Sequence, residues 1–205
     1  MSEKIMFKLN QDMYEYIGLQ RTGIKGERIE ERYYASVLSD YKSIRNELNS
    51  FETVLDIGCG LAGIDYFLAK HNPAAKIYLL DATKKEKNIY YGYADRGCNY
   101  NDLTLALGFL KMNGIENDLM IYDIFEEFEW PKVDLVISLI SWGFHYPVET
   151  YLDQVVKILN EGGLIIIDIR KNISPDPRKL FEDRGFKTEI IQYSMKYLRI
   201  KAYKK

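Results

Sequence analysis

From about residue 52 to the C-terminus, the sequence alternates short, almost entirely apolar strand-like runs with helix-like segments. The strand-like runs are TVLDIG, KIYLLD, DLMIYD, VDLVISLI and LIIIDI, and helical patterns such as AGIDYFLAKHN lie between them. Apolar strands that are separated by helices are typical of a parallel sheet with both faces covered. The alternation therefore predicts an α/β fold with a doubly wound, mostly parallel sheet.

The two ends of the chain depart from this alternation. Two more strand-like runs, FKTEIIQY and KYLRIKAY, follow each other near the C-terminus without a helix between them. Because parallel neighbours need a long crossover, we expect these runs to form a C-terminal antiparallel hairpin at one edge of a seven-stranded sheet. Residues 10–50 carry apolar residues at three- and four-residue spacings, which predicts helices. We expect residues 1–50 to form an N-terminal helical cap and residues 51–205 to form the main domain.

Composition limits the classes of partner and site. The chain has 205 residues, of which 47% are hydrophobic, so one domain can form a core without metals or disulfides. Its net charge of −2 lacks the basic footprint of most nucleic-acid-binding proteins, so no nucleic-acid partner is expected. The two cysteines, Cys59 and Cys98, do not have the spacing of a metal site. Neither a long apolar run nor a signal peptide is recognisable, so we expect a soluble cytoplasmic protein without a membrane segment.

A glycine-rich loop follows the first strand of the main domain. Gly58, Gly60 and Gly63 satisfy the pattern G-x-G-x-x-G, and Asp81 lies at the end of the next strand. Glycines let the backbone approach a ligand closely, the following helix offers its N-terminal N–H groups, and the acid accepts hydrogen bonds from ribose hydroxyls. These residues predict a site for a nucleoside-containing ligand, and by themselves they fit NAD equally well.

Asp56 favours one class of ligand over another. Its carboxylate precedes the first glycine of the loop by two residues. A negative charge at this position is unfavourable beside a pyrophosphate and favourable beside a cation. S-adenosylmethionine carries a sulfonium and an ammonium group and no phosphate, so Asp56 favours S-adenosylmethionine over NAD.

The run VLDIGCG, residues 54–60, resembles the first motif of the class I S-adenosylmethionine-dependent methyltransferases. The C-terminal hairpin is similar to the reversed seventh strand of that Rossmann-like fold, and the resemblance extends from about residue 50 to the C-terminus. Ala62 stands where the family pattern usually has a third glycine. The resemblance implies that Asp81 binds the ribose and that Asp123 receives the adenine amino group. The cofactor-binding residues that it implies are Asp56, Gly58, Cys59, Gly60, Asp81, Ala82, Asp123, Ile124 and Leu139.

The sequence that follows the fourth strand, SLISWGFHYP, is predicted to lie beside the transferable methyl group, because ligands of open α/β sheets bind at the carboxyl ends of the strands. Methyl transfer is an in-line displacement in which the protein aligns the acceptor and, for a hydroxyl, removes a proton. His145 is the predicted general base, since an unperturbed histidine has a pKa near 6.5. The alternative is that His145 only packs against the next helix.

Several aromatic and basic residues are candidates for acceptor binding. Arg170 follows the fifth strand on the same rim of the sheet and could pair with a carboxylate or phosphate. The alternative to acceptor binding is that these residues pack in the core or lie on solvent-exposed faces of helices. The residues that we expect to bind the acceptor are Trp142, Tyr146, Arg170, Tyr14 and Arg21.

The predicted function is methyl transfer from S-adenosylmethionine to a small-molecule acceptor, with oxygen as the first choice of acceptor atom and nitrogen as the second. SLISWG has no carboxylate, which argues against metal-assisted catalysis, and it has neither the Asn/Asp-Pro-Pro-aromatic run nor the Pro-Cys pair of nucleic-acid methylation. An NAD-dependent oxidoreductase is one alternative, which leaves Asp56 and the hairpin unexplained. A catalytically silent S-adenosylmethionine-binding partner protein is the other.

Overall fold

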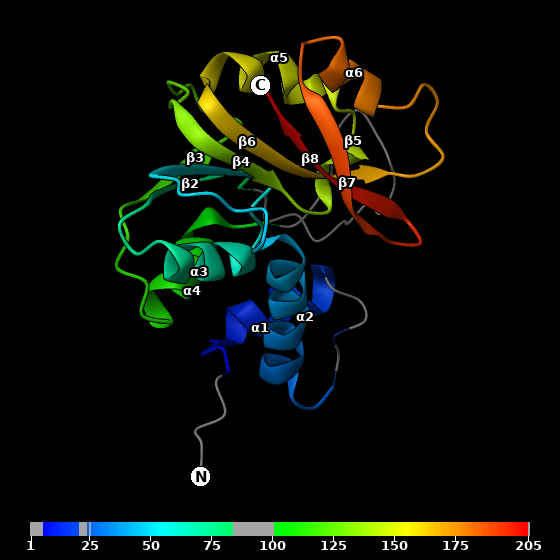
Figure 1. Ribbon diagram of the computed structural model, residues 1–205. Helices are drawn as coiled ribbons and strands as arrows, with labels where there is room; N and C mark the ends of the chain where they lie inside the picture. The colour runs from blue at the N-terminus through cyan, green and yellow to red at the C-terminus, as the bar shows by residue number, and fades with distance from the viewer. Residues whose placement is uncertain (1–5, 21–23, 25, 84–100, 205) are drawn as a thin grey trace.

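The computed structural model describes residues 6–20, 24, 26–83 and 101–204, and its centre is a seven-stranded sheet (Figure 1). The strand order is β3-β2-β1-β4-β6-β8-β7. β1, β2, β3, β4 and β6 are parallel, whereas β8 runs antiparallel to both of its neighbours. The predicted sheet and its C-terminal hairpin are therefore confirmed. The strands are β1 Thr53–Ile57, β2 Lys76–Asp81, β3 Leu119–Asp123, β4 Val133–Ser138, β6 Leu159–Arg170, β7 Lys187–Tyr193 and β8 Tyr197–Tyr203, and the short β5, Ser141–Tyr146, is not among the strands of this order.

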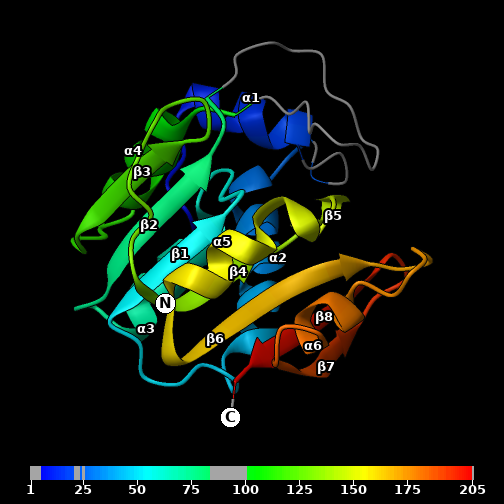
Figure 2. The same ribbon diagram turned by 90° about the horizontal axis from the view of Figure 1, so that it is seen from above.

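Helices cover both faces of the sheet, as Figures 1 and 2 show. α5 (Glu149–Ile158) and α6 (Arg178–Glu182) lie on one face. α3 (Gly63–His71) and α4 (Leu103–Met112) lie on the other. The buried apolar residues accordingly form two clusters, one on each side of the sheet, and the central strands contribute to both. This two-sided burial explains why the strand sequences are almost entirely apolar.

The N-terminal helices α1 (Gln11–Gln20) and α2 (Ile29–Ile44) pack on the face that carries α3 and α4. Their buried side chains belong to the same hydrophobic cluster as those of α3, α4 and β1. A Cβ atom at Gly63 would lie 2.6 Å from the Tyr33 hydroxyl and 2.9 Å from a Val37 methyl group. The glycine at the start of α3 thus allows α2 to approach closely, and the N-terminal helices share one core with the sheet.

One element boundary differs from the prediction. The pattern VETYLDQVVKILNEGG predicts a helix that continues to a Gly-Gly stop, but α5 ends at Ile158 and β6 begins at Leu159. Leu159 pairs with Val133 of β4, so strand pairing takes over where the apolar pattern continues. Among the described helices, none combines the length and the apolar character that crossing a membrane requires.

Candidate functional site

The glycine loop connects the carboxyl end of β1 to the start of α3. Gly58 and Gly60 have φ values of 78° and 57°, in the left-handed region that glycine enters most easily. The Gly58 N–H donates a hydrogen bond of 2.7 Å to the Leu80 carbonyl, which ties the loop to the end of β2. Ala62 has a φ of 56°, so the residue that replaces the usual third glycine still takes the left-handed conformation. The loop therefore keeps its turn in spite of this departure from the family pattern.

Side chains from two other elements approach the backbone of this loop. A Cβ atom at Gly58 would lie 1.8 Å from the Ser141 Oγ atom at the start of β5. A Cβ atom at Gly60 would lie 2.7 Å from the hydroxyl oxygen of Tyr16, a buried residue of α1. Both positions thus require glycine for two reasons: another side chain approaches the backbone too closely for a Cβ atom, and φ is positive. The loop lies between β5 and α1.

Asp81 ends β2 with its carboxylate turned toward the glycine loop. The carboxylate accepts hydrogen bonds from the Gly60 N–H, at 2.8 Å, and from the Ala82 N–H, at 2.7 Å. Burial raises the pKa of Asp81 to about 6, although the two backbone N–H donors and the nearby Asn101 carboxamide oppose the shift. These contacts hold a half-buried acid at the position where a ribose hydroxyl pair would need one.

Asp123 and Ile124 lie beside Asp81 at the end of β3. Asp81 and Asp123 are paired residues of the neighbouring strands. The Asp123 carboxylate accepts hydrogen bonds from the Thr83 N–H, at 3.1 Å, and the Phe125 N–H, at 3.0 Å. The Ile124 N–H donates to the Asp81 carbonyl at 3.0 Å, and its side chain is exposed. This edge of the sheet therefore presents a carboxylate and an apolar surface next to Asp81.

Two further acids are buried behind the glycine loop. Asp56, in β1, contacts Asp65, in the first turn of α3, and both side chains are enclosed. Burial and the charge of Asp65 raise the pKa of Asp56 well above its usual value, and burial raises the pKa of Asp65 to about 7. Burial, together with the nearby carboxylates, also raises the pKa of the Cys59 thiol. Acidic groups therefore cluster at this point of the sheet, and their raised pKa values favour protonation.

Asp65 is a site residue that the sequence analysis did not identify. The signal in the sequence is a single acid within the apolar helix GIDYFLAKH, three residues before Leu68, which is fully buried. Residues three apart share one face of a helix, so an acid at this spacing is expected to be buried. A buried acid in a helix that follows a glycine loop is a candidate for contact with the strand before that loop.

The segment between β4 and β5 packs directly against the glycine loop. Ser138 Oγ donates a hydrogen bond of 2.7 Å to the Ile57 carbonyl, and Leu139 packs on the cluster that also contains Cys59. Ser141 Oγ and the Tyr146 hydroxyl lie 2.8 Å apart. Burial, followed by the charge of Asp81, raises the pKa of Tyr146, so its phenol stays protonated at neutral pH. Ser141 and Tyr146 thus place two hydroxyl groups against the loop.

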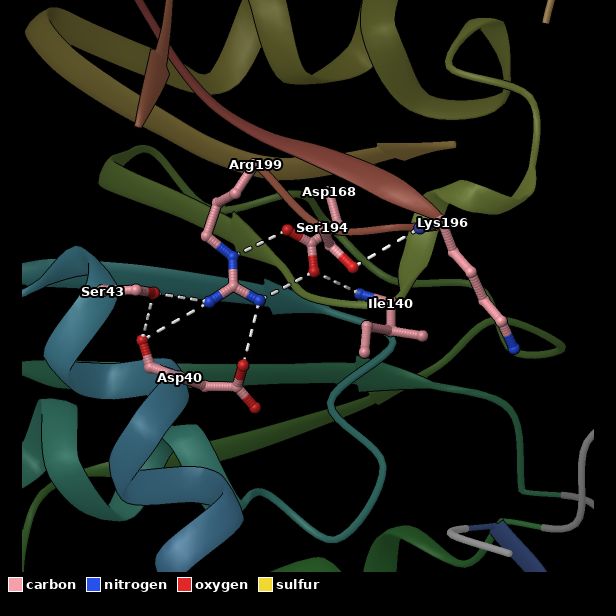
Figure 3. Close-up of polar contacts among 7 residues, drawn as sticks. All are labelled: Asp40, Ser43, Ile140, Asp168, Ser194, Lys196 and Arg199. Carbon is pink, nitrogen blue, oxygen red and sulfur yellow. Dashed lines mark hydrogen bonds and ion pairs between the residues drawn. The ribbon is translucent and has the colours of Figure 1, made fainter. Parts of the chain in front are cut away.

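A buried ion network fixes the other side of this segment, as Figure 3 shows. Arg199 in β8 contacts both carboxylate oxygens of Asp168 in β6, at 2.7 and 2.9 Å. The same guanidinium contacts Asp40 at 3.1 Å and the Ser43 hydroxyl at 2.7 Å, both in α2. Asp168 also accepts a hydrogen bond of 3.2 Å from the Ile140 N–H, whose residue has a φ of 57°. The network therefore joins α2, the sheet and the β4–β5 segment.

His145 and Arg170 both contact the ring of Phe144. The imidazole of His145 makes an edge contact with the Phe144 ring, with centroids 4.9 Å apart. The Arg170 guanidinium lies 4.9 Å from the centre of the same ring and donates to the Phe144 carbonyl at 3.3 Å. Phe144 thus brings the predicted base and the predicted anion-binding residue together at the end of β6.

The structure corrects the prediction for Trp142. Its indole is fully buried, donates a hydrogen bond of 2.8 Å to the Val148 carbonyl and packs against Tyr151 and Phe181. A completely enclosed ring with a satisfied N–H contributes to the core and offers no surface to an acceptor.

The remaining predicted acceptor residues belong to the N-terminal region. Tyr14 donates a hydrogen bond to Glu30, which joins α1 to α2, while Arg21 lies outside the described residues. Within the described ranges, no group of His, Cys, Asp and Glu side chains is placed to hold a metal ion.

Comparison with sequences of known proteins gives two results. No protein-family model matches the chain. The ribosomal RNA small subunit methyltransferase C of Salmonella arizonae is 27% identical over 158 residues, and that of Salmonella choleraesuis is 28% identical over the same length. Each match covers 74% of this chain and 39% of the relative. The chain thus spans about two fifths of the length of the relatives that it matches.

These relatives overturn the expectation that the chain has no nucleic-acid partner, because their names identify them as methyltransferases of ribosomal RNA. The expectation rested on the net charge of −2, which averages over the whole chain. Residues 159–205 hold 11 Lys and Arg against 6 Asp and Glu. Net charge was a poor guide because the chain is basic in one region and acidic elsewhere.

Solved structures of methyltransferases have the same fold. Precorrin-6y C5,15-methyltransferase of Geobacter metallireducens is 19% identical with a TM-score of 0.56, and the match covers 84% of this chain and 87% of that one. Magnesium protoporphyrin IX methyltransferase of Synechocystis, solved with bound SAM, is 19% identical with a TM-score of 0.56, and covers 97% and 99%. Strand order, glycine loop and these similarities together show that the chain has the fold of these methyltransferases.

Proposed function

We propose that this protein transfers the methyl group of S-adenosylmethionine to an acceptor. The observation that carries the proposal is the buried carboxyl of Asp56 behind a glycine loop whose Gly60 N–H is held by the Asp81 carboxylate. A pyrophosphate beside this acid would meet unfavourable charge, whereas a sulfonium or ammonium group would be stabilised. The same argument weighs against an NAD-dependent oxidoreductase.

The described residues fit the three parts of this cofactor. Asp56 and the backbone of Gly58 and Gly60 would hold the positively charged end. Asp81 would accept hydrogen bonds from the ribose hydroxyls, and Asp123 would accept one from the adenine amino group. The side chains of Ile124 and Leu139 would pack against the adenine. Cys59 in the glycine loop and Ala82 after β2 would complete the contacts with the cofactor.

When bound, S-adenosylmethionine supplies a methyl group that its sulfonium has already activated. The residues of the chain then need to align the acceptor and to remove a proton from it. Ser141 and Tyr146 place their hydroxyls against the glycine loop, where they can orient an acceptor by hydrogen bonds. Tyr146 acts as a donor rather than a base because burial raises its pKa. His145 is the proposed base, and Arg170 is the proposed partner of an acidic group on the acceptor.

A hydroxyl-bearing small molecule is the proposed acceptor, and its oxygen is the proposed methylation site. The sequence after β4 lacks the Asn/Asp-Pro-Pro-aromatic run expected for amino methylation of nucleic acid. Ribosomal RNA is the second candidate, since the sequence relatives carry that acceptor in their names.

Ligand-induced stabilisation tests the cofactor. At about 100 times its dissociation constant, S-adenosylhomocysteine should stabilise the protein by roughly 2.7 kcal/mol, which raises the melting temperature by about 5–10 °C. Asp81→Asn should remove most of this rise, because it weakens the acceptor of the ribose hydroxyls. The matched control is Asp118→Asn at the exposed ion pair with Lys76, which should keep the rise. Stabilisation by NAD alone would overturn the proposal.

Transfer of a labelled methyl group tests the acceptor and the base. Incubation with radiolabelled S-adenosylmethionine should place the label in a small-molecule extract, and label in the RNA of small ribosomal subunits would establish the second candidate instead. His145→Gln should lower kcat by about 10²–10⁴-fold, because a general base typically contributes that much. A kcat that stays within about twofold of wild type would show that His145 only packs on Phe144.

A further inference from the structure

Asp65 is a buried acid for which the fold supplies no hydrogen-bond donor. Both of its carboxylate oxygens are enclosed and, within the described part of the chain, neither accepts a hydrogen bond from a donor group. It lies in the first turn of α3 among the buried residues Ile64, Phe67 and Leu68. An apolar side chain at this position would bury without penalty, whereas an unsatisfied carboxyl group is expensive. A structural role in packing does not account for an acid here.

The contact between Asp65 and Asp56 identifies what Asp65 does. Their carboxyl groups lie within hydrogen-bonding reach of each other, yet two ionised carboxylates have no proton to donate. A hydrogen bond between them requires one proton on the pair. The N-terminus of α3 favours negative charge in its first turn, so the state with one proton and one negative charge is the expected one near neutral pH.

Among the residues that the structure describes, the groups around the pair add no compensating charge. Asp81 faces it from the end of β2, and its charge opposes ionisation of Asp56. The Cys59 thiol faces it from the glycine loop, and the Tyr146 phenol faces it from β5; burial raises the pKa of both groups, so both are neutral. Below about pH 7, full ionisation of the pair therefore needs a positive charge that the described residues do not supply.

We propose that Asp65 is a positioning residue that shares a proton with Asp56 and releases it when the cationic end of the cofactor binds beside Asp56. This inference rests on the proposed function, because S-adenosylmethionine and S-adenosylhomocysteine both carry an ammonium group. The O–H bond of the carboxyl pair breaks, the proton passes to the solvent, and both carboxylates are then ionised opposite the ligand cation. No other bond changes in this step.

Proton release makes binding depend on pH in a defined direction. Below about pH 7 the free pair holds its proton and must lose it on binding, so the affinity falls as the pH falls. For one proton the fall approaches tenfold per pH unit, as linkage requires. Above that range the dependence disappears, because the pair has already lost the proton.

Isothermal titration calorimetry of the full chain with S-adenosylhomocysteine tests this inference. Titrations at pH 6.0 in two buffers of different ionisation enthalpy, and again at pH 7.5, give the number of protons released. Wild type should release close to one proton at pH 6.0 and far less at pH 7.5. Binding of S-adenosylhomocysteine without proton release at pH 6.0 would overturn the inference while leaving the proposed function intact. No binding by wild type at either pH would overturn both.

The variant Asp65→Asn assigns the proton to this pair. Its amide can donate to an ionised Asp56, so the release should vanish and the affinity should vary less than about threefold between pH 5.5 and 7.5. Asp118→Asn, at an exposed ion pair, is the control and should keep the release. A proton still released by Asp65→Asn would assign it to Asp81 or Cys59 and would overturn the inference. If Asp65→Asn does not fold, the absence of proton release by wild type at pH 6.0 still overturns the inference, and Asp81→Asn, which should keep the release, separates the pair from Asp81.

Discussion

Two groups of carboxylates in this protein, one around Arg199 and one behind the glycine loop, differ in how their charge is balanced. Asp168 and Asp40 both pair with Arg199, which contacts them at 2.7 and 3.1 Å. Burial alone would lower the pKa of Arg199. The contact with the Asp168 carboxylate raises the pKa by more than burial lowers it, so the guanidinium stays charged. Asp65 has no hydrogen-bond donor among the described residues, and its nearest charged neighbour is the equally buried Asp56. One group is satisfied by the fold, and the other leaves negative charge for a ligand to balance.

This difference separates acids that stabilise the fold from acids that are available to balance the charge of a ligand. An ion pair that is complete inside the fold holds elements together, and breaking it leaves a buried charge. A buried acid pair without a cation reduces stability, which is typical of functional sites. The β4–β5 segment touches both groups, through the Ile140 N–H at Asp168 and through Ser141 beside Gly58. The structural network therefore positions the segment that borders the proposed site.

Arg199→Met should give the largest effect, because it removes the cation of the balanced group. We expect the free energy of unfolding to fall by about 3–5 kcal/mol, since the fully buried Asp168 carboxylate loses its counter-ion. Urea unfolding at pH 7.5 measures this change. Lys201→Met is the control, because its ion pairs with Glu47 and Glu189 are partly exposed and should contribute less than about 1 kcal/mol. Equal losses for the two variants would contradict the distinction between the groups.

Asp65→Asn should act in the opposite direction on the unbalanced group. Burial raises the pKa of Asp65 to about 7, so the folded protein holds a proton that the unfolded chain loses above about pH 4. The stability from this proton is complete at low pH and is lost as the pH rises through 7, with a slope of up to about 1.4 kcal/mol per pH unit. The variant should flatten this slope and be more stable than wild type by about 1–2 kcal/mol at pH 7.5.

Urea unfolding at half-unit pH steps from 5.0 to 7.5 measures the slope for wild type and variant. Asp153→Asn is the control, because Asp153 is exposed in its ion pair with Arg184 and the variant should keep the wild-type slope. A variant that is less stable than wild type at pH 7.5 would show that Asp65 stabilises the fold, and the contrast with Asp168 would then be wrong.

Local patterns in the sequence were sufficient for the fold. Strands such as VDLVISLI are predominantly apolar because both faces of the sheet are buried. The lack of a helix between the last two strands predicted their antiparallel pairing. The sequence predicts a longer α5 than the structure has, because Leu159 and Asn160 continue the helical pattern beyond Ile158. Pairing of Leu159 with Val133 overrides that local preference.

The site was predictable only where a motif is contiguous. The glycine loop and Asp81 follow from one motif, and the structure brings them together. Arg199 and Asp40 are 159 residues apart, a separation at which periodicity carries no information. Trp142 was placed at the acceptor because it follows β4, but the left-handed turn at Ile140 precedes a strand that buries the indole. Such burial depends on residues distant in sequence.

Tyr146→Phe should give the smallest effect and tests the segment that touches both groups of acids. It removes the hydrogen bond between the Tyr146 hydroxyl and Ser141 Oγ but leaves the Ile140 contact with Asp168 in place. We expect a loss of about 0.5–1.5 kcal/mol in the free energy of unfolding, as for one buried hydrogen bond. Tyr151→Phe, which keeps the ring packing against Trp142, should change it by less than about 0.5 kcal/mol. Urea unfolding measures both variants. If Tyr146→Phe lowered the free energy of unfolding as much as Arg199→Met does, the hydrogen bond to Ser141 would stabilise the β4–β5 segment as strongly as the contact with Asp168. The ion network in Figure 3 would then not be the main support of this segment.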